Sequence, residues 1–314
     1  MQARIILLPG STVGERMCSF AEEVLTDISV AFGHTFSILR DKIGEASVRS
    51  YGVPLSDGTM QQCAKASAVF LGDSNVEGEQ TLLRALGVPV KLRAFSVGGT
   101  DDGHFSIARA IHDERAAVND MFEAVMKLAV SRDQPLNYVL PEGEPLRSRF
   151  REAVELICRQ DADRVRELSP ADAVERLIAD PAHLGILAGS DYAGSMFLTL
   201  TTSLHGAPML LFDQCPGKTV SVYEPLIPEK VKPGDELNPL GAISAVASML
   251  RDSLGLSQEA DCVSSAVKNI LDAGWRTPDM TDMGDGISSY KMQQLISDQI
   301  NLAGELLQQH GDRK

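Results

Sequence analysis

Two short glycine motifs in the chain have the residue types needed to bind a nucleotide or a phosphate. Gly217–Thr219 is similar to the end of a phosphate-binding P-loop, but Phe212 stands where that loop requires its leading glycine. Gly10 and Gly14 are too sparse for the dinucleotide-binding fingerprint, which needs three glycines at fixed spacing. Neither motif by itself therefore predicts a nucleotide site.

Nucleophilic and metal-binding side chains also lack the spacing that their chemistry requires. Ser203 and His205 have no nucleophile elbow around them, and the six histidines have no metal-ligand spacing. An odd number of widely spaced cysteines with no CxxC argues against a disulfide framework or a zinc knuckle. We interpret them as reduced and mostly buried: Cys18, Cys63, Cys158, Cys215 and Cys262.

Composition indicates an ordinary globular protein that is long enough for two α/β lobes, and it argues against several classes of partner. The 314 residues are 44% hydrophobic and 23% charged, which is enough apolar material for two lobes. A net charge of −14 argues against nucleic-acid binding, which needs clustered lysines and arginines. The longest apolar stretches, such as Ile5–Leu8 and Met209–Phe212, are far shorter than the roughly 20 residues of a membrane span. With no basic, signal-like start, we expect a cytoplasmic protein without nucleic-acid or membrane partners.

Short β-type runs alternate with helical patterns along the chain, which predicts α/β architecture with at least partly parallel sheets. The expected buried strands are Arg4–Leu8, Ser67–Gly72, Val90–Val97, Leu184–Gly189 and Met209–Phe212. Gly274 follows the last of three helical apolar stripes and is expected at its C′ position. These stripes, which we interpret as core faces, are Val118/Met121/Phe122/Val125, Phe150/Ala153/Val154/Ile157 and Val263/Ala266/Val267/Ile270. No flexible linker is present, so a second domain must be an insertion.

Four stretches, in order along the chain, resemble the isopropylmalate/isocitrate dehydrogenase family, the metal-dependent β-decarboxylating dehydrogenases. The first two, ILLPGSTVGER and GVPLSDGTMQQCAKASAVFLG, are similar to the family's opening LPGDGIGPE loop and its GxPLPxxTLxxCxxxDAVLLG segment. The third covers residues 178–208, and the fourth, YEPLIPEKVKPGDELNP, is similar to YEPxHGSAPDIAGxxxANP. The tail GWRTPDM resembles the family's closing RTxDL.

This resemblance implies an isopropylmalate dehydrogenase-like two-lobed α/β subunit with a central cleft. Residues 1–96 and 207–314 are expected in a large discontinuous lobe, and residues 97–206 in an inserted, shortened dimerisation lobe. A homodimer is implied, and a hetero-oligomer with an intact relative stays open. The chain lacks the RExTGGxYxG segment and dimer arm that the family places after Gly99, and with them the proton-transfer tyrosine.

The family's metal and base positions carry different residues here. Its GDILSD helix is matched by GSMFLT, so the two metal carboxylates correspond to Ser195 and Thr199, which bring no charge. A third metal aspartate corresponds to Ala171, with Asp172 one position away, and the general-base lysine corresponds to a position near Leu140. Lewis-acid catalysis needs hard oxygen ligands, so the resemblance predicts an absent or weak metal site.

The family's cofactor and substrate positions are kept in part. IPEKVK at residues 227–232 replaces the nucleotide-binding HGSAPD, whereas Thr59, Glu224 and Asn238 match the family, although each also has a structural interpretation as a helix start or turn former. Poor NAD binding is therefore expected. Arg84 and Arg93 resemble the first two substrate arginines, and Arg109 is a candidate for the third; each of the three is equally open to interpretation as a solvated arginine.

Two hypotheses follow. The chain is a degenerate or repurposed member that binds a small anionic or carboxylate ligand and needs no cofactor. Alternatively, it is an active NAD-dependent dehydrogenase of a 3-substituted malate such as 3-isopropylmalate, using NAD with Mg²⁺ or Mn²⁺ and recruiting Asp172 or Asp191 as a carboxylate.

Overall fold

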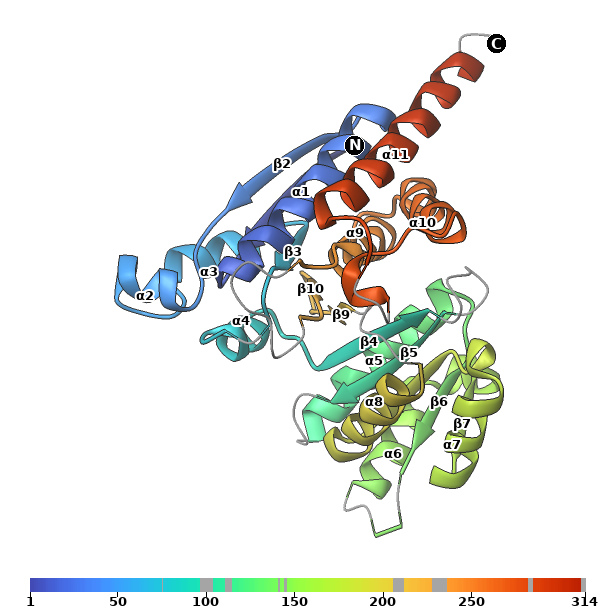
Figure 1. Cartoon of the computed structure of the whole chain (residues 1–314). Helices are drawn as coiled ribbons and strands as arrows, with labels where there is room; N and C mark the ends of the chain where they lie inside the picture. The colour runs from blue at the N-terminus through green and yellow to red at the C-terminus, as the bar shows by residue number, and fades with distance from the viewer. Residues whose placement is uncertain are drawn as a thin grey trace. The chain divides into compact units, whose positions relative to one another are not determined.

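The computed structural model describes residues 1–74, 76–96, 104–110, 115–140, 142–143, 146–205, 212–227, 236–281 and 285–311 (Figure 1). The chain divides into two compact units. The first is Met1–Leu86 with Pro208–Phe212 and Thr219–Lys314, and the second is Gly87–Ala207 with Asp213–Lys218. Both units therefore contain segments that are distant in the sequence.

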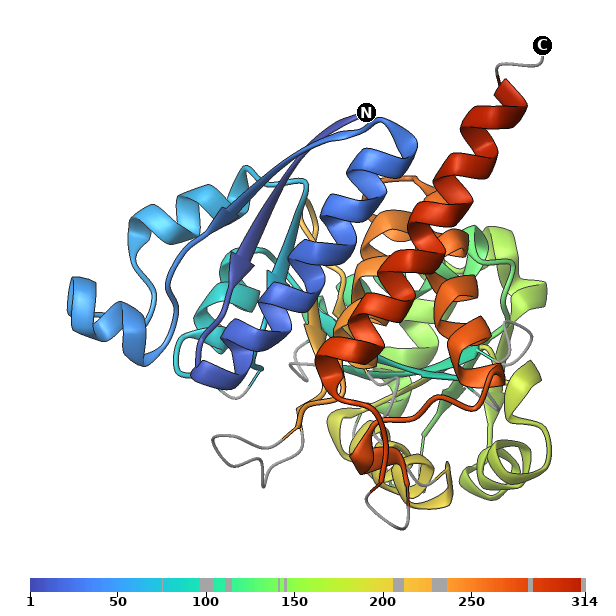
Figure 2. The same cartoon turned by 45° about the horizontal axis from the view of Figure 1, so that its top comes forward.

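The first unit has a parallel sheet with strand order β2, β1, β3, β10. Figure 2 shows its helices α1 and α11, which pack against each other. The strands are β1 (Gln2–Leu8), β2 (Thr35–Arg40), β3 (Ala68–Leu71) and β10 (Val222–Pro225). The helices are α1 (Thr12–Phe32), α2 (Glu45–Tyr51), α3 (Asp57–Ala64), α4 (Glu79–Ala85), α9 (Leu240–Asp252), α10 (Ser257–Asp272) and α11 (Ser289–Gly311), with a 3-10 turn at Pro278–Met280.

Local sequence explains the start of this unit. Ile5–Leu8 is fully buried, as expected of a central parallel strand covered on both faces. Helix α1 begins after Ser11, whose side chain accepts a hydrogen bond from the Gly14 backbone N–H. A Cβ atom at Gly14 would lie 1.7 Å from the carbonyl oxygen of Pro9, so the glycine allows the helix to approach β1 closely. Gly14 thus has a packing role.

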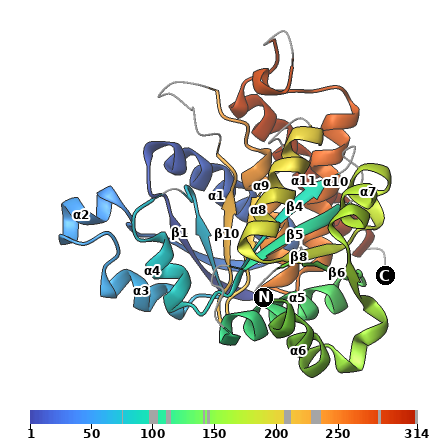
Figure 3. The same cartoon turned by 90° about the horizontal axis from the view of Figure 1, so that it is seen from below.

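The second unit has strand order β9, β4, β5, β8, β6, β7, in which β4 and β5 are antiparallel and β5, β8, β6 and β7 pair in parallel. Figure 3 shows α7 and α8 on one face of these strands and α5 and α6 on the other. The strands are β4 (Val90–Ser96), β5 (His104–Ala110), β6 (Leu136–Val139), β7 (Val165–Leu168), β8 (Ile186–Gly189) and β9 (Phe212–Cys215). The helices are α5 (Arg115–Ser131), α6 (Arg147–Ile157), α7 (Pro170–Ala179) and α8 (Asp191–His205), with 3-10 turns at Arg159–Arg164 and Pro181–His183.

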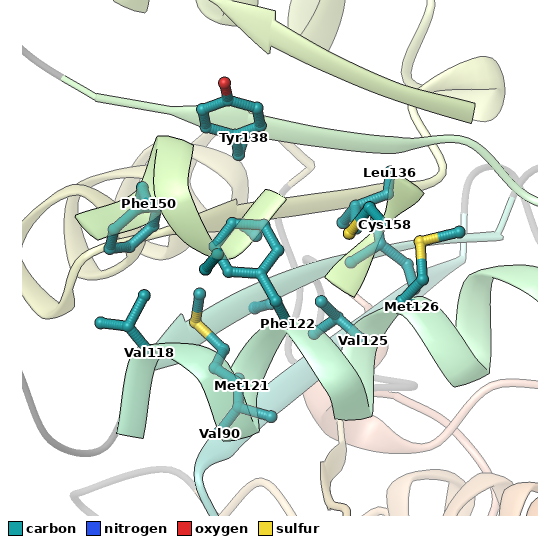
Figure 4. Close-up of a cluster of buried hydrophobic side chains, with 14 of the residues drawn as sticks. Val90, Val118, Met121, Phe122, Val125, Met126, Leu136, Tyr138, Phe150 and Cys158 are labelled. Carbon is teal, nitrogen blue, oxygen red and sulfur yellow. The ribbon is translucent and has the colours of Figure 1, made fainter. Parts of the chain in front are cut away.

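An aromatic cluster forms the core between α5, α6 and the sheet of the second unit (Figure 4). The Phe122 ring lies edge-on to Phe150, with centroids 5.4 Å apart, and to Tyr138, with centroids 6.0 Å apart. Val118, Met121, Phe122 and Val125 are all fully buried, which confirms the helical stripe predicted for this segment.

The structure confirms the predicted mixed α/β fold class and refines several elements. Helix α10 ends in a Schellman motif, with Gly274 at φ +87° and the Trp275 backbone N–H donating to the Ile270 carbonyl, as the sequence predicts. The strand expected at residues 209–212 is seen as β9 from Phe212 onward, and residues 206–211 lie outside the described residues. Strand β4 belongs to the second unit because it pairs with β5, whereas the sequence-based division at residue 96 placed it in the first lobe.

Candidate functional site

Cationic side chains gather on one face of the β4–β5 ribbon in the second unit. Lys91 lies directly opposite Arg109 in the antiparallel register, and Arg93 follows Lys91 by two residues along β4. Because side chains alternate between the two faces of a strand, all three project from the same face. The alternate residues Val90 and Leu92 belong to the buried core on the α5 face. The hydrophobic core thus orients the cationic residues.

Arg93 holds a buried carboxylate from a distant segment of the chain. Its Nε donates to Asp213 Oδ1 at 2.7 Å, and its Nη2 donates to Asp213 Oδ2 at 2.6 Å. The side chains of Arg93 and Asp213 are 19% and 8% exposed. This is the bidentate geometry with which arginine recognises carboxylates, and it joins β4 to β9.

The charges around Asp213 determine its protonation. Burial raises the pKa of the Asp213 carboxyl, but the charge and hydrogen bonds of Arg93, and then the charges of Lys91 and Arg109, bring that pKa below its ordinary value. Asp213 is therefore a carboxylate at neutral pH. The four side chains, three cationic and one anionic, form one electrostatic group, which we call the cationic cluster.

Helix α8 packs against the cationic cluster at Arg109. A Cβ atom at Gly194 would lie 3.0 Å from the Arg109 Cβ, so glycine at this position allows the helix to lie close to β5. Arg109 also faces Gly189 in the parallel pairing of β5 with β8, immediately before α8 begins. The cluster therefore lies on the α8 face of the sheet, opposite the aromatic core.

Of the three arginines predicted to bind an anion, Arg93 and Arg109 are brought together within one unit. Arg84 is exposed on the last turn of α4 and belongs to the first unit. Sequence reasoning missed Lys91 and Asp213. Lys91 could have been found, since its spacing of two from Arg93 in an expected strand puts both on one face. Asp213 gave no such signal, because strand pairing alone brings it to Arg93 across 120 residues.

The positions of the expected metal ligands do not offer the donors that a divalent cation needs. Ser195 and Thr199 both lie on α8, and the Thr199 hydroxyl donates to the Ser195 carbonyl at 3.0 Å. Asp172 lies in the first turn of α7, where its backbone N–H and its carboxylate both bond the Ser169 hydroxyl at the helix start. Neutral hydroxyls and a capping carboxylate are a poor set of ligands for Mg²⁺ or Mn²⁺.

Leu140 and Asp191 are the two remaining positions at which the base or a carboxylate was expected. Leu140, near the expected position of the catalytic lysine, is 2% exposed and contributes to the hydrophobic core. Asp191 is the first residue of α8, and its side chain lies outside the described residues. Within the described part of the chain, no three His, Cys, Asp or Glu side chains converge as a metal site.

Two of the three retained cofactor-type residues lie at helix starts in the first unit, and the third is buried in a strand. Thr59 is 1% exposed, and its backbone N–H donates to the Ser56 hydroxyl at the start of α3. Asn238 accepts a hydrogen bond from the Leu240 backbone N–H at the start of α9, at 2.9 Å. Glu224 is fully buried in β10. Residues 228–235, which include most of the IPEKVK segment, lie outside the described residues. Helix capping accounts for Asn238, and the Thr59 hydroxyl lies 2.9 Å from the Ser56 hydroxyl at the start of α3, so these two residues have a structural explanation without a nucleotide.

Solved structures share this architecture. The crystal structure of a β-decarboxylating dehydrogenase from Thermococcus kodakarensis, in its apo form, matches with a TM-score of 0.81 at 19% identity and covers 95% of this chain and 96% of that one. Isocitrate dehydrogenase from Methylococcus capsulatus matches with a TM-score of 0.79 at 19% identity, over 95% and 99% of the two chains. The fold is therefore that of the isopropylmalate dehydrogenase-like α/β proteins.

Sequence comparison agrees with the fold. The family model described as isocitrate/isopropylmalate dehydrogenase matches residues 148–296. The 3-isopropylmalate dehydrogenase of Geobacillus kaustophilus is 28% identical, covering 91% of this chain and 92% of that protein, and the one of Rhodopirellula baltica is 27% identical, covering 93% and 97%. The chain is therefore similar, over more than 90% of its length, to proteins of the isocitrate/isopropylmalate dehydrogenase family. No helix among the described residues is both long and apolar enough to span a membrane.

Proposed function

We propose that this chain is a diverged member of its family that has lost the metal-dependent oxidative decarboxylation and binds a small anion, as a regulatory or repurposed protein. The observation that carries this proposal is the convergence of Lys91, Arg93 and Arg109 on the single carboxylate of Asp213. Guanidinium groups stay charged at any working pH, so such a group can attract an anion without a metal or a cofactor.

The donor chemistry on α7 and α8 supports the loss of the ancestral reaction. A divalent ion would have to stabilise negative charge on the reacting oxygen, and this needs carboxylate ligands. Ser195 and Thr199 supply hydroxyls instead, and the Thr199 hydroxyl is already engaged with the helix backbone. Asp172 is held by Ser169 at the start of α7. The described residues therefore fit a binding role better than metal-assisted chemistry.

The arrangement of the cationic cluster supports a doubly charged anion as the ligand class. Three cations and one carboxylate lie on one sheet face, and the β4–β5 register fixes Lys91 directly opposite Arg109. A small dicarboxylate, phosphate or sulfate has the charge and the acceptor oxygens to bond several of these donors at once. Such an anion also compensates the clustering of like charges.

Thermal unfolding with and without anions tests the proposal. Malate, citrate, phosphate or sulfate should raise the melting temperature, because a ligand that binds the folded state alone stabilises it by mass action. Arg109→Ala and Lys91→Ala should each weaken that rise, and Arg84→Ala tests whether the third predicted arginine contributes. Arg49→Ala is the matched control, because Arg49 is an exposed arginine on α2 in the other unit. A rise of equal size in all these variants would mean that the anions act nonspecifically, and the proposal would fail.

A second function is favoured by the relatives. Proteins named 3-isopropylmalate dehydrogenase match more than 90% of the chain, and Glu224 and Asn238 of the cofactor segment are retained. If the chain is active, purified protein with NAD, Mg²⁺ or Mn²⁺ and a panel of 3-substituted malates should increase absorbance at the NADH band. Activity that Asp172→Asn or Asp191→Asn abolishes would support this second function and refute the loss of catalysis.

Assembly and location belong to the same proposal. We propose a cytoplasmic homodimer formed through the lobe expected at residues 97–206, and a hetero-oligomer with an intact relative stays the alternative. Size-exclusion chromatography with light scattering distinguishes a dimer from a monomer. Capture of a full-length relative from the source cells would indicate the hetero-oligomer.

A further inference from the structure

Asp213 contacts Arg93 as an external carboxylate ligand would. Both of its oxygens accept hydrogen bonds from one guanidinium, at 2.7 and 2.6 Å. The remaining cations of the cluster, Lys91 and Arg109, act on the same carboxylate. The part of the cluster best suited to bidentate recognition is therefore already occupied by a residue of the chain.

Strand β9 contains polar residues although it is buried, and each of them bonds an arginine. All four residues of β9 are buried, yet the two central ones, Asp213 and Gln214, are polar. Each accepts a hydrogen bond from an arginine: Asp213 from Arg93, and Gln214 from Arg132, whose Nη2 lies 2.6 Å from Gln214 Oε1. Successive residues of a strand point to opposite faces, so a charged pair lies on one face of β9 and a neutral acceptor on the other. A neutral side chain is thus sufficient to bond an arginine in this strand, and only the anion-binding face carries a carboxylate.

We propose that Asp213 is an internal competitor that occupies the Arg93 guanidinium and sets the affinity and the charge requirement of the anion site. This inference rests on the proposed function, because it concerns the regulation of the same site. An incoming anion must either displace the Asp213 carboxylate from Arg93 or bind to Lys91 and Arg109 beside it. In both cases the negative charge of Asp213 opposes binding.

Competition favours ligands that carry more than one negative charge. A monoanion such as acetate can replace Asp213 at Arg93 only at a net cost, since one carboxylate is traded for another and the displaced Asp213 carboxylate stays buried without its main partner. A dianion such as malonate can bond Arg93 through one carboxylate and Lys91 or Arg109 through the other. We therefore expect malonate to bind and acetate to bind weakly.

Isothermal titration with malonate and with sulfate tests the competition directly. Asp213→Asn preserves the shape of the side chain and removes its charge, so malonate should bind at least tenfold more tightly than to the wild type, as the strength of a charged hydrogen bond implies. Acetate should also become a measurable ligand of this variant. Gln214→Leu is the matched control, because it changes the neighbouring residue of β9 on the opposite face and should leave malonate affinity unchanged.

The outcomes separate this inference from the proposed function. Equal malonate affinity in wild type and Asp213→Asn would overturn the competition and leave the anion site standing. No binding of malonate or sulfate by either protein would refute both the proposed function and this inference.

A measurement on the wild-type protein covers the case in which Asp213→Asn does not fold. NMR spectra follow the Nε–H resonances of Arg93 and Arg109, and the Arg93 resonance is assigned by its absence in Arg93→Lys. Both resonances should shift during a titration with malonate. If the Arg109 signal moves and the Arg93 signal does not, the ligand avoids Arg93, and competition with Asp213 is refuted.

Discussion

Removal of Arg93 should destabilise the second unit severely, because it leaves the Asp213 carboxylate buried without its main partner. The Asp213 side chain is 8% exposed and bonds Arg93 through both oxygens. Breaking a buried ion pair on one side typically costs about 3–5 kcal/mol, mostly because the remaining charge is left desolvated. We expect Arg93→Met to lower the free energy of unfolding by that amount at pH 7.

A double variant distinguishes two contributions to the loss of stability in Arg93→Met: the unpaired buried charge of Asp213 and the lost packing of the Arg93 side chain. Adding Asp213→Leu removes the charge, so Arg93→Met/Asp213→Leu should be more stable than Arg93→Met alone. Urea-induced unfolding followed by circular dichroism measures both. Arg49→Met is the control, because Arg49 pairs with Glu45 on the surface, where an ion pair contributes about 1 kcal/mol or less.

The destabilisation caused by Arg93→Met should also depend on pH, which provides an independent test of the same prediction. In the wild type the pKa of Asp213 lies below its ordinary value, so the pair contributes stability that is present above the unfolded-state pKa of about 3.9 and is lost as pH falls through the lower folded-state pKa. In Arg93→Met the pKa of Asp213 should rise, because burial raises it and Arg93 no longer opposes this. The difference in stability between the two proteins should therefore shrink from pH 7 toward about pH 4.5. A cost of under about 1 kcal/mol, as for a surface pair, or one that grows as pH falls would refute the reasoning.

Three further predictions concern packing and helix capping, and each is measured by the same unfolding assay. Phe122→Ala should cost about 3–5 kcal/mol, since its fully buried ring fills the aromatic core; a cost near that of a surface substitution would contradict the core assignment. Gly14→Ala should destabilise by about 1–3 kcal/mol despite the higher helix propensity of alanine, because the new Cβ would overlap the Pro9 carbonyl, and a gain in stability would show that α1 can move away from β1. Ser169→Ala should cost about 1 kcal/mol by removing the cap that bonds Asp172, and an unchanged stability would mean that solvent caps α7 equally well.

Much of the fold was predictable from local patterns. The apolar stripe of α5 and the glycine after α10 are local signals, because a helix repeats every 3.6 residues and its C′ position favours a residue that tolerates positive φ. The strand predicted at residues 209–212 overlaps the described part of β9 at Phe212, and the continuation of β9 through Asp213 and Gln214 was not predicted, since these polar residues do not look like strand residues. Their polarity is compensated by Arg93 and Arg132, which lie in distant segments.

The amino-acid sequence alone determined the family resemblance, the alternation of strands and helices, and the presence of the neutral residues Ser195 and Thr199 at the positions that the resemblance matches to metal carboxylates. These features depend on residue type and short-range spacing. Only the tertiary structure decided that Arg93 is bonded by Asp213 and that Lys91 joins it beside Arg109. The reason is physical: strand pairing brings together segments that are far apart in the chain, and the charge that a partly buried arginine meets depends on that pairing and not on its neighbours in sequence.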